Sequence, residues 1–185
     1  MLMSYHFYKK RTKKFKDLIE RKDNLLYVKH ERLPFTGVVE DFHDNGQLES
    51  RHNYKNGKLH GLFETYFVKG QLEKKGNFKD GLPEGSWEEY SLGCYLKTSK
   101  LYYKNGKPDG IWESYYDNGQ LMNKKIYKDG KKDGLCVGFW DDGRLEYQEN
   151  YKDGKKDGLC EYFDWRNDSC EFQEWKSGKL IETYR

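Results

Sequence analysis

The side chains that most often carry out chemistry in proteins are present in this sequence, but their spacing does not assemble a reactive site. The five histidines are His6, His30, His43, His52 and His60. No two of them stand at metal-ligand spacing beside a cysteine, and none belongs to an HExxH motif. His52 and His60 flank one turn, but two histidines alone do not define a site. We therefore expect no bound metal and no histidine-dependent catalysis.

Acidic residues and glycines lead to the same expectation. Glu88 and Glu89 are adjacent on a predicted strand, where alternation sends neighbouring side chains to opposite faces, so they do not form a catalytic pair. The 19 glycines include no GxxxxGK[ST] phosphate loop, and the sequence contains no GxSxG motif. The sequence thus predicts a chain that is not an enzyme and uses no cofactor. A function in binding remains.

The charge of the chain is unevenly distributed. Residues 1–33 contain ten Lys or Arg and four Asp or Glu, whereas the other residues contain 24 basic and 27 acidic side chains. Because phosphate binding needs concentrated positive charge, the slightly acidic part is a poor surface for nucleic acid, which is not the expected partner. The basic part could contact an acidic partner, a phosphate backbone or an anionic membrane, or could simply be solvated.

Hydrophobic runs and cysteines indicate where such a chain would reside. No stretch approaches the ~20 apolar residues of a membrane span, and the first residues lack the apolar region of a signal peptide. The four cysteines form no CxxC motif. Cys136 and Cys160 hold the same place in successive repeats, about two strand spacings or 9.5 Å apart, which is too far for a disulfide. We expect reduced thiols and a cytoplasmic protein.

A repeat of about 24 residues organises most of the chain. Each unit starts at the aromatic residue before a Lys/Ser-Gly turn, at Tyr54, Phe78, Tyr103, Tyr127, Tyr151 and Trp175, with a degenerate earlier unit near His30. One interval has 25 residues instead of 24, and we place the extra residue after Leu96. The sequence therefore predicts a lead-in at residues 1–29 and a repeat array at residues 30–185.

Two turns divide each unit into a pair of short strands. Asn45-Gly46 and Asn118-Gly119 represent one turn, and Asn105-Gly106 represents the other. Asn-Gly and Asp-Gly tolerate the positive φ angles of tight hairpin turns. The runs between the turns are rich in aromatic residues and too short for stable helices. The predicted fold is an antiparallel meander of stacked hairpins.

The units resemble MORN repeats of the variant form. The segments YKNGKPDGIWESYYDNGQL and YKDGKKDGLCVGFWDDGRL carry the resemblance most clearly, and it extends over residues 30 to 185. It implies an all-β fold, an elongated single antiparallel sheet of solenoid type, and a function as a scaffold, a protein-binding surface or a membrane-associated module. Bacterial members are often labelled antitoxins. The segment FDWRNDSCEFQEW departs from the pattern, so we expect an irregular C-terminal hairpin.

Rings and glycines recur within each unit and predict how hairpins stack. We expect the aromatic residues at positions +9 and +12 after the unit start to form ladders along the sheet. The glycine at position +7, for example Gly61 or Gly110, would let a neighbouring ring lie flat against the backbone.

The lead-in is predicted to form a basic amphipathic helix that caps the first hairpin. From Ser4 to Lys22 it contains no Gly or Pro, and Phe15, Leu18 and Ile19 would fall on one face. Such a cap would cover one of the two open edges that a sheet of this kind presents.

Exposed rings are the predicted partner-binding residues, since Tyr and Trp are enriched at interface hot spots. The candidates are Tyr66, Phe67, Trp87, Tyr90, Trp112, Tyr115, Tyr116, Phe139 and Trp140. The candidates for contact with an anionic partner are Lys9, Lys10, Lys13 and Lys14. The alternative interpretation is that the rings simply form the core and the lysines are solvated.

Two functions compete on this evidence. The first is a non-enzymatic protein-binding module that sequesters or neutralises a partner, as an antitoxin-like protein or a viral inhibitor of a host protein would. The second is a membrane-surface scaffold that binds anionic lipid through the basic helix. A homodimer through an open sheet edge is a further possibility.

Overall fold

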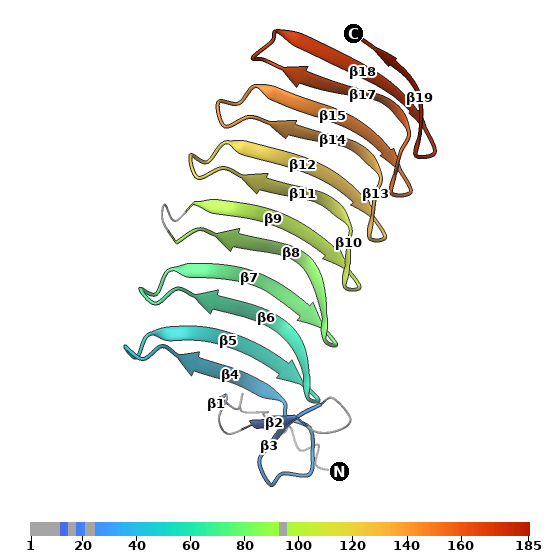
Figure 1. The fold of residues 1–185 in the computed structure, drawn as a ribbon. Coiled ribbons are helices and arrows are strands. Elements are labelled where there is room, and N and C mark those ends of the chain that lie inside the picture. Colours follow the sequence, from blue (N-terminus) through green and yellow to red (C-terminus); the bar gives the residue numbers. More distant parts are fainter. Residues whose placement is uncertain (1–11, 15–17, 21–24, 93–95) are drawn as a thin grey trace, which may run out of the picture. The chain divides into compact units, whose positions relative to one another are not determined.

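The computed structural model of the chain describes residues 12–14, 18–20, 25–92 and 96–185 (Figure 1). The chain divides into two units, of which the first comprises Met1–Leu72 and Asn77–Leu82 and the second comprises Glu73–Gly76 and Pro83–Arg185. Each unit is built from antiparallel hairpins that follow one another in chain order, and the described residues contain no helix. The predicted all-β fold of stacked hairpins is confirmed.

The first unit begins with short strands and continues with longer hairpins. Its strands are β1 (Thr12–Lys14), β2 (Leu18–Glu20), β3 (Leu26–Val28), β4 (Gly37–Phe42), β5 (Leu48–Lys55), β6 (Lys58–Tyr66) and part of β7 (Leu72–Lys79). Strand β4 pairs with β5, and β5 pairs with β6, in antiparallel register. Strands β2 and β3 form a separate two-stranded sheet.

The predicted N-terminal helix is wrong wherever the structure describes the segment. Thr12–Lys14 is a strand that pairs in parallel with β4, and Leu18–Glu20 is a strand that pairs with β3. The edge of β4 offers backbone groups that a neighbouring strand can pair with. This pairing favours a strand over a helix, because the helical pattern of apolar residues in the segment is short and weak. The remaining residues of the expected helix, including Phe15, lie outside the described residues.

The lead-in nevertheless contacts the first hairpin, as the sequence predicts. Val28, Phe35 and Val39 form a buried cluster, and Leu18 packs against it. The backbone N–H of Leu26 donates to the carbonyl of Gly57 over 2.9 Å, which ties the lead-in to the first tight turn. The strand pair β2–β3, instead of a helix, contributes Leu18, Leu26 and Val28 to this apolar cluster.

The second unit repeats one hairpin pattern. Its strands are β8 (Leu82–Tyr90), β9 (Lys97–Lys104), β10 (Lys107–Pro108), β11 (Gly110–Tyr115), β12 (Leu121–Lys128), β13 (Lys131–Lys132), β14 (Gly134–Phe139), β15 (Leu145–Lys152), β16 (Lys155–Lys156), β17 (Gly158–Asp164), β18 (Ser169–Lys176) and β19 (Lys179–Tyr184). The β11–β12, β14–β15 and β17–β18 hairpins are antiparallel, and β12 pairs with β14 as β15 does with β17.

The two turns of each repeat differ in geometry. At the turn after the unit start both central residues have positive φ, for example 49° at Asn105 and 77° at Gly106, which is the requirement of a type I′ turn. At the other turn only the glycine does, with φ 83° at Gly119, and the pairing shifts between Ser114 and Tyr115. The second turn is therefore followed by a bulge, which the sequence pattern alone does not distinguish.

The extra residue of the 25-residue interval lies before Leu96 and not after it. Tyr90 pairs with Lys97, whereas the equivalent residue of the next hairpin, Tyr115, pairs with Leu121. The interval between partners is thus one residue longer, so the insertion lengthens the turn. A loop tolerates an added residue, whereas a strand would have to turn every following side chain to the opposite face.

The sheet has two chemically different faces. The face that we call the ladder face carries positions +9 and +11, such as Trp112 and Ser114, and the opposite glutamate face carries positions +8 and +10, such as Ile111 and Glu113. Position +12 follows +10 onto the glutamate face. The prediction of ladders at +9 and +12 is therefore right for +9 only.

Rings of the ladder face pack against neighbouring rings, both within a repeat and between successive repeats. In the second unit the centroids of Tyr103 and Trp112 are 5.2 Å apart, and those of Trp112 and Tyr127 are 4.9 Å apart. In the first unit His52 stacks on Phe63 at 4.1 Å. Tilted and stacked ring pairs of this kind add ~0.5–1.5 kcal/mol each beyond area burial. The row joins neighbouring hairpins, none of which is stable alone.

The glycines that support flat rings are not those at position +7. A Cβ atom on Gly76 would lie 2.0 Å from the Trp87 ring, and one on Gly138 would lie 2.1 Å from the Tyr147 ring. The +7 glycines are instead required by their backbone, since Gly110 has φ 79° at a bend in the strand. The predicted role of the +7 glycine is thus corrected, because positive φ and not ring contact selects glycine there.

Replacing Gly138 by Ala tests the packing of Tyr147 on the backbone. The added methyl group overlaps the ring, so we expect a loss of about 1–3 kcal/mol in the free energy of unfolding. In a Tyr147→Ala background the same change should cost much less, because the overlapping ring is gone. Thermal melts followed by circular dichroism measure the four variants of this cycle. Equal losses in both backgrounds would show that the ring contact is not the reason for glycine.

Candidate binding surface

A partly buried ion pair joins two hairpins on the ladder face of the second unit. Lys156 Nζ lies 2.7 Å from Glu149 Oε1, and the two side chains are 24% and 13% exposed. The hydroxyls of Tyr151 and Tyr162 both donate to Glu149 over 2.9 Å. Lys156 also lies 5.0 Å from the centroid of the Trp175 ring. Each polar group here has a partner, as burial requires.

Burial and hydrogen bonding oppose each other in this network. Burial tends to raise the pKa of Glu149, but hydrogen bonds from Lys156, Tyr151 and Tyr162 outweigh it and lower that pKa. Burial likewise opposes the charge of Lys156, and its bonds to Glu149 and Tyr162 raise its pKa. Both shifts favour the ionised pair, so it remains ionised at neutral pH. Burial raises the pKa of Cys136 and Cys160, which lie in the same row.

The glutamate face combines paired charges with an apolar row. Glu113 faces Lys124 across the strands, and Tyr115 donates its hydroxyl to Glu113 over 2.9 Å. Tyr90 and Glu88 repeat this bond one hairpin earlier. At position +8 of successive hairpins the face carries Ile111, Leu135 and Leu159, which are 46%, 42% and 43% exposed. We call these three residues the apolar row.

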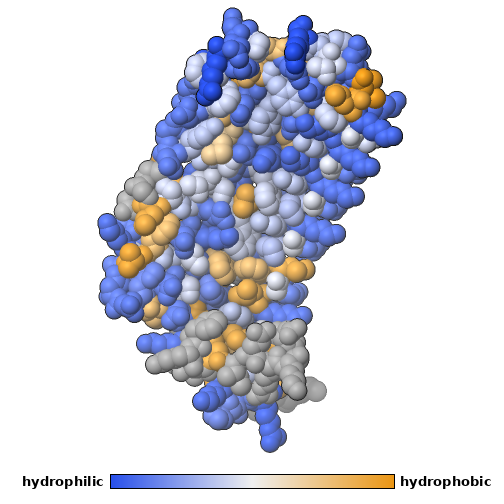
Figure 2. All heavy atoms as spheres, viewed as in Figure 1, coloured by the Kyte–Doolittle hydropathy of each residue, from blue (hydrophilic) through white to orange (hydrophobic). Residues whose placement is uncertain are grey.

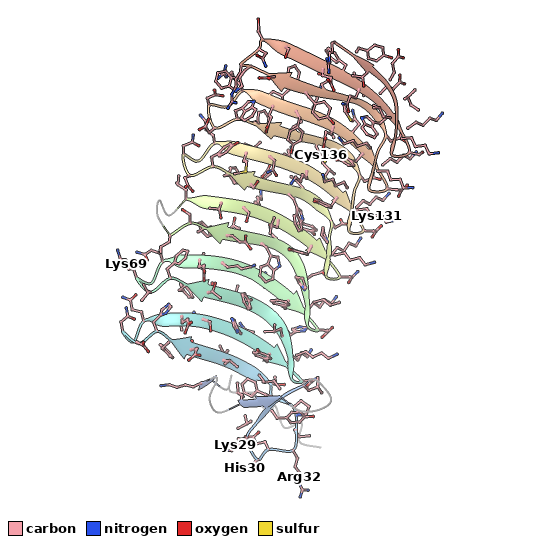
Figure 3. All side chains as sticks on the ribbon, in the orientation of Figure 1. Lys29, His30, Arg32, Lys69, Lys131 and Cys136 are labelled. Carbon is pink, nitrogen blue, oxygen red and sulfur yellow. The ribbon has the colours of Figure 1, made fainter. Side chains whose placement is uncertain are left out.

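The type I′ turns of the second unit form an edge of exposed lysines. Each turn carries two, and they are Lys104, Lys107, Lys128, Lys131, Lys152, Lys155, Lys176 and Lys179. Figure 3 shows Lys131 at such a turn, whereas Cys136 lies on the strand beyond it. The backbone N–H of Gly154 donates to the carbonyl of Lys132 over 2.8 Å, so successive turns stack. This stacking repeats the lysines at a regular interval.

Comparison with known proteins identifies the repeats. The family model of the MORN repeat variant matches residues 35–56, 59–80, 108–129 and 132–153. This chain is a MORN repeat protein. The matches omit residues 81–107, where the turn has an extra residue, and 154–185, where the Asn-Gly turn is lost. MORN repeats are generally modules that bind proteins or membranes. No curated protein matches the chain.

The structure places the predicted partner-binding rings of these MORN repeats at several depths. Trp87 is 3% exposed and offers no surface. The other rings are half-buried, namely Tyr66, Phe67, Tyr90, Trp112, Tyr115, Tyr116, Phe139 and Trp140. Tyr115 and Tyr90 lie on the glutamate face, whereas Trp112 belongs to the ring ladder. The predicted set is thus divided between the two faces and does not form one patch.

The predicted basic site is mostly outside the described residues. Nothing is described for Lys9 and Lys10, or for the side chain of Lys13. Lys14 is exposed, and its Nζ lies 5.6 Å from the centroid of the Phe42 ring. The described residues include no cluster of three or more His, Cys, Asp or Glu suited to a metal, and no helix among them is long and apolar enough to cross a membrane.

Sequence reasoning missed the apolar row. It searched for aromatic residues, whereas the exposed row at position +8 of this MORN array is aliphatic. A usable signal was present, because Ile111, Leu135 and Leu159 follow the +7 glycine directly in three successive repeats. Strand alternation then places them on the face opposite to the ring ladder.

Replacing Lys156 by Met tests the ion pair of the ladder face. Glu149 would lose its cation, so we expect the free energy of unfolding to fall by about 2 kcal/mol. This is less than for a fully buried pair, because both groups are partly solvated. The exposed neighbour change Lys155→Met should alter stability little. The pKa of Glu149 is lowered in the folded state. The difference in free energy of unfolding between Lys156→Met and the wild type should therefore shrink as the pH falls below about 4.3, the pKa of Glu in the unfolded chain. Denaturant unfolding at several pH values measures it, and equal losses for both lysines would contradict this role.

Proposed function

We propose that this MORN repeat protein is a binding module that sequesters or neutralises a partner protein through the glutamate face of its second unit. The observation that supports this most is the apolar row, in which three branched side chains of successive hairpins are each more than 40% exposed. Soluble proteins rarely expose apolar side chains in a continuous series unless a partner covers them. Figure 2 shows a viewed surface that is mainly hydrophilic, with separate hydrophobic patches.

Charge placement on this face supports specific recognition. Glu113 and Lys124 are paired across adjacent strands beside Ile111, so the face presents alternating charges next to apolar side chains. An apolar centre with a polar rim is the usual anatomy of protein interfaces. Burying the exposed part of each side chain of the row would contribute about 1 kcal/mol. A neutralising role, as in an antitoxin-like protein or an inhibitor, requires only such stoichiometric binding.

Changing the apolar row tests the proposal. The measurement is recovery of a stoichiometric protein partner after crosslinking in the native cell. We expect the double variant Leu135→Glu and Leu159→Glu to recover about tenfold less of this partner, or lower still, than the wild-type chain does. The matched control is Ser86→Glu, which adds a charge at the exposed +8 position of β8. Retention of the same partner by the double variant would refute the proposed surface, provided that its melting curve is unchanged.

A loop of the first unit supports binding to an anionic membrane as a second candidate function. Leu33 is 77% exposed, and the basic residues Lys29, His30 and Arg32 precede it (Figure 3). An exposed apolar side chain beside basic residues such as Lys29 and Arg32 is typical of a peripheral contact with anionic lipid. This loop, rather than a helix, would then carry the lipid contact, together with the basic lead-in.

Flotation with lipid vesicles tests this second function. We expect binding to vesicles that contain phosphatidylserine and none to purely zwitterionic vesicles, with an approximately five- to tenfold loss for Leu33→Ser combined with Arg32→Glu, since about 1 kcal/mol per basic residue is at stake. Leu82→Ser serves as control, because Leu82 is also exposed but lies at a different turn. Equal flotation of the Leu33 variant and the control would exclude the loop as the contact.

A further inference from the structure

A cleft of about 800 Å³ lies in the second unit, between residues of the β14–β15 and β17–β18 hairpins. Its aromatic walls come from Trp140, Tyr147 and Tyr162, and Phe163, which follows Tyr162 on β17, also borders it. Its carboxylates come from Glu146, Asp164, Asp168 and Glu171. One basic residue, Arg185, also borders it. The cleft is therefore aromatic and negatively charged.

The cleft forms where the repeat pattern breaks. The β17–β18 hairpin lacks the Asn-Gly turn, and its strands pair without a bulge as far as Asp164 and Ser169. The corresponding hairpin before it shifts register between Gly138 and Phe139. The expected irregular C-terminal hairpin is thus more regular in pairing than its neighbours, and its turn introduces two aspartates. Departures from a local rule concentrate at functional sites.

The aromatic walls are fixed by the fold. The Tyr147 ring lies flat on the backbone of Gly138, as the close approach of its ring atoms shows. Burial raises the pKa of Tyr147, so its hydroxyl stays neutral. The Trp140 Nε1 atom is buried and has no hydrogen-bond partner among the described residues, so this indole borders the cleft through its ring and not through its N–H group. A rigid aromatic wall suits a planar group, which can stack on it.

Three of the four carboxylates have no cationic partner among the described residues, and only Glu171 is paired with one. Asp164 accepts hydrogen bonds within its own turn from Arg166 N and Asn167 Nδ2. Glu171 pairs with Arg185, whose Nε lies 3.2 Å from Glu171 Oε2. No ion pair engages Glu146 or Asp168 among the described residues. The cleft consequently keeps negative charge that a bound cation would neutralise.

The chain's own arginines show which cation this region accepts. Arg185 reaches Glu171 although its side chain is 83% exposed. Beside the cleft, the guanidinium of Arg144 lies 4.3 Å from the centroid of the Trp165 ring and pairs with Asp142. Both contacts combine a guanidinium with a carboxylate, and one adds ring stacking. Guanidinium is planar, so it can stack on a ring and bind a carboxylate with two N–H groups, whereas ammonium cannot do both.

We propose that this cleft binds the guanidinium group of an arginine side chain on a partner protein, and that Arg185 is a weak internal competitor for it. The bound guanidinium lies between the aromatic walls and is held by Glu146 and Asp168. Only the source of the arginine, a partner protein, rests on the proposed protein-binding function. The cleft itself can be tested with a short peptide.

The probe is the peptide acetyl-Gly-Arg-Gly-amide, titrated into the full chain and followed by NMR and tryptophan fluorescence. Peptides with citrulline or lysine in place of arginine are the matched probes, since citrulline keeps the shape without the charge. We expect the citrulline peptide to bind about tenfold or more weakly and the lysine peptide about threefold more weakly, as charge-assisted and planar contacts are lost in turn. Equal binding of the citrulline peptide would overturn the proposal. Equal binding of the lysine peptide would overturn the assignment to guanidinium.

Variants of the chain locate the site. The double change Glu146→Gln and Asp168→Asn should weaken binding about fivefold or more, whereas Glu174→Gln, an exposed carboxylate on β18, should leave it unchanged. Arg185→Gln should strengthen binding about twofold to fivefold by removing the competitor. Unaltered binding by the double variant refutes the site, and weaker binding by Arg185→Gln refutes the competition. The apolar-row variant should lose its cellular partner but still bind the peptide. That outcome distinguishes arginine binding in the cleft from the proposed function of the apolar row.

Discussion

Every hairpin of this chain depends on its neighbour, because a two-stranded hairpin buries too little apolar surface to be stable in water. Two kinds of contact supply the coupling. Rings of the ladder face pack across the strands, as Trp112 does with Tyr127 at 4.9 Å. At the edge, each tight turn donates a backbone hydrogen bond to the turn before it, as Gly130 does to Pro108 over 2.8 Å. Stability therefore grows by nearest-neighbour terms along each unit.

This coupling explains why so much of the fold was predictable from the sequence. Paired Asn-Gly and Asp-Gly turns and the recurring rings are local signals, and each requires a hairpin wherever it occurs. The helix was the main error, because a segment without Gly or Pro was interpreted on its own propensity. The edge of β4 and the cluster around Phe35 decide its conformation instead, and they become visible only when distant residues are placed together.

The candidate site was less predictable for a related reason. A ring at position +9 and one at +12 look equivalent in the sequence, yet one lies in the ladder and the other on the opposite face. Trp87 shows the consequence, since it packs on Gly76 and is buried. Exposure depends on what the neighbouring repeat places opposite each ring, and a glycine there makes the difference. Aliphatic residues such as Leu135 lie on the opposite face and remain exposed.

The same regularity that stabilises a repeat array limits what it can recognise, because identical repeats present identical surfaces. A distinct binding site therefore needs a place where the pattern changes. In the second unit the change is the turn around Asp164 and Asp168, and it adds carboxylates beside aromatic walls that belong to the preceding repeat, such as Tyr147. The regular part holds Tyr147 in place through Gly138, while the irregular turn supplies charge. Rigidity and specificity thus come from different residues, so the turn can vary without loss of the stacking that keeps the hairpins folded.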